Sequence, residues 1–118
     1  MERRRFISVV AEVLDSLPET FRRRIHNVAV LVEDLPPSQL QRTRRRPRYM
    51  VLGVFRGVPL TRKSVFDFSS GPDYIVLYQK NIEAVCSGDD EIRHQIRQTV
   101  LHELGHYFGM SEAQLEAV

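Results

Sequence analysis

The residues best placed to do chemistry form the string His102-Glu-Leu-Gly-His106. On a helix, two histidines four residues apart lie about 40° apart around the axis, so both imidazoles can reach one ion. Glu103 stands beside them, suited to accept a proton from bound water rather than to ligate the metal. Zinc would lower the pKa of that water towards 7 and polarise a carbonyl group. The string therefore predicts Zn²⁺ bound by His102 and His106, with Glu103 as general base.

A catalytic zinc site needs a third protein ligand. Twelve residues follow His106, so we do not expect this ligand to come from a distant later helix. Gly109 stands three residues after His106, and Glu112 three residues after Gly109. Because glycine adopts a positive φ without steric cost, Gly109 can reverse the chain and return Glu112 towards the imidazoles. Glu112 is the predicted third ligand, although the helix dipole would also stabilise a glutamate in the first turn of a helix without any metal.

A long amphipathic helix is expected to carry the motif. Apolar residues recur every four positions at Ile92, Ile96, Val100, Leu104 and Phe108, after the capping and acidic residues 87–91. Gly109 is the expected C-cap. Ser111 followed three residues later by Gln114 has the form of a capping box, which predicts a short helix after the turn.

The remaining elements must position that helix. Apolar residues at helical spacing from Phe6 to Leu17 predict a first helix that Pro18 ends. Three apolar runs predict strands, the first of them buried: Val28–Val32, Met50–Phe55 and Tyr74–Tyr78. In the third, residues 74, 76 and 78 are expected on one face and 75 and 77 on the other. Glycines, prolines and serines in residues 57–73 predict a long connection.

Composition limits the class of protein. A chain of 118 residues with 42% hydrophobic and 27% charged residues is typical of one soluble domain spanning residues 1–118. The single cysteine, Cys86, excludes an internal disulfide and a CxxC site, and we expect it to be a packing residue. The apolar runs are too short to span a bilayer, and Glu12 and Asp15 interrupt the N-terminal apolar stretch. We therefore expect a cytoplasmic protein without a membrane partner.

Four segments together resemble a family of small bacterial zincin-like metallopeptidases: Val100–Gly109, Val54–Thr61, Pro72–Tyr78 and Leu14–Pro18. The resemblance implies an α+β minimal zincin fold, in which the motif helix and an N-terminal helix pack on a small mixed β-sheet. It also implies a metal held by the two motif histidines and an acidic residue after the glycine. That residue is often Asp in the family and is Glu112 here. The family likeness further implies that a peptide would lie antiparallel along an edge strand, here Tyr74–Tyr78.

Three hypotheses for function follow. The first is a zinc-dependent metallopeptidase that hydrolyses peptide or protein substrates, with Glu103 activating the water. The alternative is a non-catalytic zinc-binding module of the same fold that binds a peptide or protein partner. The third draws on Arg42–Arg48, where five of seven residues are arginine and could contact phosphates. No aromatic interleaving or nucleic-acid motif accompanies this charge, so we expect a solvated loop and no nucleic-acid partner.

Overall fold

The computed structural model describes residues 1–25, 28–37, 51–56 and 73–117. Its elements, in chain order, are α1 (Arg3–Asp15), α2 (Glu19–Ile25), β1 (Val28–Glu33), β2 (Gly53–Arg56), β3 (Asp73–Tyr78), α4 (Gln79–Ala84), α5 (Asp89–Tyr107) and α6 (Glu112–Glu116). The predicted first helix, motif helix and short last helix are confirmed as α1, α5 and α6. The long connection predicted at 57–73 lies almost wholly outside the described residues.

The three strands form one mixed sheet in the order β1-β3-β2. β1 runs parallel to β3, with Val30 opposite Ile75. β2 runs antiparallel to β3, with Phe55 also opposite Ile75. β3 is thus paired on both sides, so the expectation that Tyr74–Tyr78 is an edge strand available to a peptide is wrong. Among the described strands, β1 and β2 lie at the edges of this sheet.

The two faces of β3 meet different clusters of side chains. Ile75 and Leu77 are fully buried in the main core, whereas Val76 and Tyr78 pack on the opposite face with Val51. This alternation confirms the prediction that residues 74, 76 and 78 lie on one face of the strand and residues 75 and 77 on the other. The prediction that the first strand is buried is wrong, because in β1 the side chains alternate and only Val28 is fully buried. An edge strand covered on one face leaves every second side chain in solvent.

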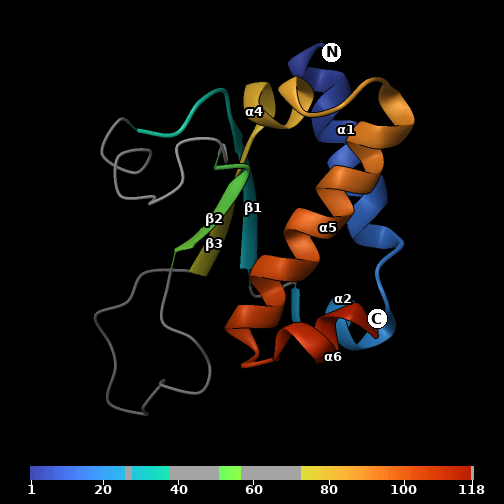
Figure 1. Cartoon of the computed structure of the whole chain (residues 1–118), viewed down its shortest axis with the longest axis vertical. Coiled ribbons are helices and arrows are strands. Elements are labelled where there is room, and N and C mark those ends of the chain that lie inside the picture. Colours follow the sequence, from blue (N-terminus) through green and yellow to red (C-terminus); the bar gives the residue numbers. More distant parts are fainter. Residues whose placement is uncertain (26–27, 38–50, 57–72, 118) are drawn as a thin grey trace.

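The main core lies between the sheet and two helices. α1 and α5 lie side by side on one face of the sheet (Figure 1), and both contribute buried apolar residues to the core. In α1 these are Phe6, Val9, Val10 and Val13, at the spacing that predicted the helix. α4 lies at one end of this layer and α2 and α6 at the other. The architecture is α+β, as expected.

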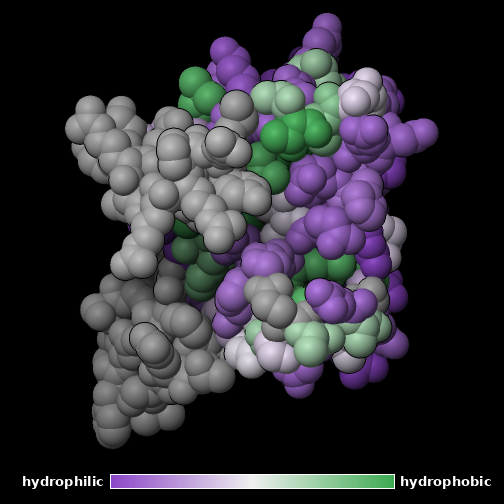
Figure 2. Space-filling view, viewed as in Figure 1, coloured by the Kyte–Doolittle hydropathy of each residue, from purple (hydrophilic) through white to green (hydrophobic). Residues whose placement is uncertain are grey.

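Ion pairs join α1 to α5 on the outside of the helical layer. Arg93 Nη1 lies 2.6 Å from Glu12 Oε2, and Arg5 Nη2 lies 3.5 Å from Asp89 Oδ2. Hydrophilic residues cover much of the helical part of the face in Figure 2. Such exposed pairs contribute little to stability, typically under about 1 kcal/mol each, so burial of the apolar stripes holds the two helices together.

Candidate metal centre

The apolar stripe of α5 fixes the rotation of the helix about its own axis, and this rotation decides which side of the motif faces solvent. Ile96, Val100 and Leu104 are completely buried at intervals of four residues, which turns that side of the helix towards the core. Three acidic residues, 89–91, stand in its first turn, where the helix dipole favours them. The helix ends at Tyr107, and its C-cap is Phe108 rather than the predicted Gly109. Gly109, the next residue, has φ 75°, the left-handed conformation expected of it.

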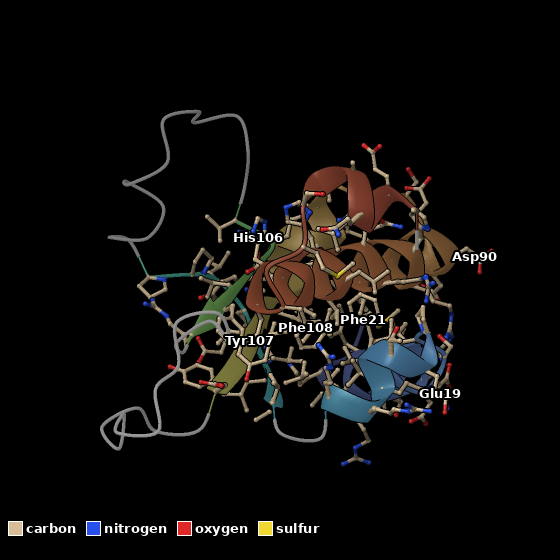
Figure 3. All side chains as sticks on the ribbon, turned by 90° about the horizontal axis from the view of Figure 1, so that it is seen from below. Glu19, Phe21, Asp90, His106, Tyr107 and Phe108 are labelled. Atoms are coloured by element: carbon tan, nitrogen blue, oxygen red, sulfur yellow. The ribbon has the colours of Figure 1, made fainter. Side chains whose placement is uncertain are left out.

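His102 and His106 lie together on the exposed side of α5. Their ring centroids are 4.7 Å apart, and the ring planes meet at 71°. Both side chains are exposed, whereas Tyr107 is buried. In Figure 3, His106 projects from one side of α5, while Tyr107 and Phe108 lie on the other side, Phe108 beside Phe21. The structure therefore brings the two predicted histidine ligands together at the surface.

Glu103 occupies the neighbouring side of α5, towards the sheet. Its side chain is half-buried, and its Oε2 accepts a hydrogen bond from the backbone N–H of Phe55 in β2, at 3.1 Å. This contact could not be predicted from the sequence, because its donor is a backbone N–H, which nearly every residue type has. The candidate base is thus held by the sheet, one residue along the helix from His102.

Glu112 is the first residue of α6, and its side chain lies outside the described part of the structure. The capping box predicted at Ser111 and Gln114 is present, with both reciprocal hydrogen bonds formed. Among the described side chains, no three histidines, cysteines or acids gather as a metal-binding group. Glu112 therefore stays a predicted ligand, on a helix that the turn at Gly109 brings back beside α5.

α6 packs closely against α5 at one glycine. A Cβ placed on Gly105, inside the motif, would lie 2.2 Å from Leu115 Cδ2, so the Leu115 side chain of α6 could not keep its place beside a larger residue. The signal for this contact was a glycine within the last turn of a helix, where it is less favourable than alanine and so calls for a packing reason.

A family model described as zincin-like metallopeptidase matches residues 25–118. The chain belongs to the zincin-like metallopeptidase family. A solved structure of similar fold is that of a conserved hypothetical protein from Thermo thermophilus, which is 24% identical, with 92% of this chain and 94% of that chain covered and a TM-score of 0.59. That similarity shows a shared fold. No curated protein matches the chain.

The histidines of this zincin-like chain fit a metal of the kind the family implies. Zinc–nitrogen bonds of about 2.0–2.1 Å place each ring centroid about 3.2 Å from the ion, and a tetrahedral angle then separates two centroids by about 5 Å. The observed 4.7 Å is close to that value. Imidazole nitrogen is a preferred zinc donor, so the two side chains suit one ion both in donor type and in ring spacing.

Two tyrosines on the elements around the site have buried side chains. Tyr107 is buried, with its ring centroid 4.7 Å from that of Phe55. Tyr78 is buried on the sheet face away from α5, where burial, followed by the negative charge of Glu33, raises the pKa of its hydroxyl. Cys86 is half-buried, and burial, followed by the charge of Glu91, raises the pKa of its thiol. A raised pKa reduces the thiolate population, which agrees with a packing role for Cys86.

Several described arginines have acidic partners within the chain. Arg3 pairs with Asp34, and Arg23 lies 3.0 Å from Glu19 Oε1. Arg24 lies over the ring of Phe108, with its guanidinium carbon 5.0 Å from the centroid. The cluster Arg42–Arg48 lies outside the described residues. Among the described helices, none combines the length and the apolar character needed to cross a bilayer.

Proposed function

We propose that this zincin-like protein is a zinc-dependent peptidase in which His102, His106 and Glu112 hold the metal and Glu103 is the general base. The observation that carries the proposal is the placement of two imidazoles 4.7 Å apart at the surface of α5, with the Glu103 carboxylate beside them and held by the sheet. Membership of a metallopeptidase family supports the same chemistry.

When bound, zinc would polarise the scissile carbonyl group and make water acidic enough to attack it near neutral pH. The histidines supply neutral nitrogen ligands from one rigid helix, and Glu112 would add a carboxylate from α6. Glu103 would take the proton from the attacking water and pass it to the leaving nitrogen, which is the role of a positioned acid–base group. The substrate would be a peptide or protein chain.

Metal content tests the ligands. The wild-type protein should hold about one zinc per chain, and His102→Ala and Glu112→Ala should both lower this content, since a three-ligand site loses affinity when any ligand is removed. His94→Ala is the matched control, because His94 is an exposed histidine of the same helix outside the motif. Unchanged zinc in both ligand variants, measured by elemental analysis, would contradict the site.

Peptide hydrolysis tests the base. Glu103→Gln should keep its zinc and lower kcat by about 100-fold or more, the usual contribution of general acid–base catalysis. Cleavage of an unstructured protein substrate, followed by mass spectrometry, measures the loss. Hydrolysis at the wild-type rate in this variant would refute the mechanism. A wild-type protein that binds zinc and cleaves no peptide would instead be the non-catalytic module.

A further inference from the structure

One stripe of α5 faces β2. Thr99, Glu103 and Tyr107 are spaced four residues apart, so they follow one another along the helix with a drift of about 40° per step. Each is close to β2: a Cβ on Gly53 would lie 2.8 Å from Thr99 Cγ2, Phe55 donates to Glu103, and the rings of Phe55 and Tyr107 are 4.7 Å apart. The candidate base is the middle of three consecutive helix–strand contacts.

The N–H of Phe55 points away from β3. Tyr78 of β3 donates its N–H to the carbonyl oxygen of Leu52 at 2.9 Å, so these two residues form a hydrogen-bonded pair of the antiparallel ladder. Hydrogen-bonded and non-hydrogen-bonded pairs alternate along antiparallel strands. Because Phe55 is three residues beyond Leu52, it belongs to a non-hydrogen-bonded pair. Glu103 therefore accepts a hydrogen bond from a donor that the pairing with β3 does not use.

From this arrangement we infer that the backbone N–H of Phe55 is a positioning group for Glu103. A hydrogen bond to a charged acceptor favours the side-chain rotamer in which it forms, so the Phe55 N–H favours the observed placement of the Glu103 carboxylate. With Oε2 held by Phe55, that oxygen has a defined position relative to α5 and hence to the two histidines on the same helix. The catalytic consequence rests on the proposed peptidase function; the placement of the carboxylate does not.

Amide hydrogen exchange tests the placement without any assay of activity. In Glu103→Ala the exchange rate of the Phe55 amide should rise by about tenfold or more, because its acceptor is gone. Glu103→Gln retains a carbonyl acceptor and should preserve most of the protection. Gln98→Ala, at an exposed position of α5, is the control and should leave the Phe55 amide unchanged. Equal exchange rates in the wild type and Glu103→Ala would overturn the inference.

Replacing the Phe55 amide by an ester tests the catalytic consequence. Incorporating phenyllactic acid at position 55 removes the N–H and keeps the ring. In the zinc-loaded enzyme kcat should fall by about tenfold or more, with KM and zinc content unchanged, since misplacing a catalytic group lowers the rate of the chemical step. The matched control is the equivalent ester at Ser87, whose N–H donates to Glu91 at 2.8 Å, remote from the site in sequence. It should keep the wild-type kcat.

The amide-exchange experiment and the ester experiment together distinguish a failure of this inference from a failure of the proposed function. A protected Phe55 amide in a protein that cleaves no peptide would support the placement of Glu103 and contradict the peptidase function. Peptide cleavage by a protein with an unprotected Phe55 amide would overturn the inference alone. An ester variant with lower zinc content and the wild-type kcat per bound zinc would also overturn it, because Phe55 would then have a purely structural role.

Discussion

Replacing Gly105 with alanine perturbs the contact between α5 and α6. The new Cβ would lie 2.2 Å from Leu115 Cδ2 and 2.8 Å from its Cγ, so the Leu115 side chain must move out of its place against α5. Overpacking of this kind costs about 1–3 kcal/mol. Alanine also gains about 1 kcal/mol over glycine in a helix interior. The free energy of unfolding should therefore fall by up to about 2 kcal/mol.

Leu115→Ala provides the background that isolates this contact. With the leucine truncated, the steric overlap is removed, and Gly105→Ala should then stabilise the protein by about 1 kcal/mol. The two substitutions should thus be coupled by about 1–3 kcal/mol, with a change of sign for the alanine at 105. Urea unfolding of the four proteins, followed by circular dichroism, gives the coupling energy. Additive effects, within about 0.5 kcal/mol, would refute the reasoning.

Two further predictions concern β2 and the thiol. Gly53→Ala should destabilise the protein by about 1–3 kcal/mol in urea unfolding, because the added Cβ meets the carbonyl oxygen of Val76 at 3.1 Å as well as Thr99. A neutral effect would contradict the close approach of β2 to α5. Burial, followed by the charge of Glu91, raises the pKa of the Cys86 thiol. The pH midpoint of its alkylation should therefore be higher in the folded protein than in the urea-unfolded chain. Glu91→Gln should reduce this difference. Because the folded state then holds the proton more tightly, stability should fall as pH rises past the unfolded pKa. Alkylation with the same midpoint in both states would contradict this.

The long helix and its cap were predictable because their signals are local. The four-residue apolar spacing of α5, its acidic first turn and Gly109 act within a few residues of where they appear. The same holds for the capping box at Ser111. Two short helices were missed. α2 buries only Phe21, and α4 includes buried polar residues, Gln79 and Asn81, so neither has an apolar stripe to read.

Strand order was not predictable from the apolar pattern. Residues 75–78 form a continuous buried run, which is typical of a central strand, whereas the family resemblance indicated an edge. Pairing with β1 and β2 joins residues far apart in sequence, and no local signal fixes such partners. At the site, the positions of His102 and His106 followed from helix geometry alone. The link from Phe55 to Glu103 spans 48 residues and became visible only in three dimensions.

The two sides of α5 carry different residues: one side packs in the core, and the other carries the two exposed histidines. The core includes Ile92, Ile96, Val100, Leu101, Leu104 and Tyr107 among its buried members, and neither His102 nor His106. Packing of this core therefore uses neither of the two proposed metal ligands. For an engineer, the same separation means that the proposed ligands at 102 and 106 can be replaced by those of another metal without a change to the apolar stripe.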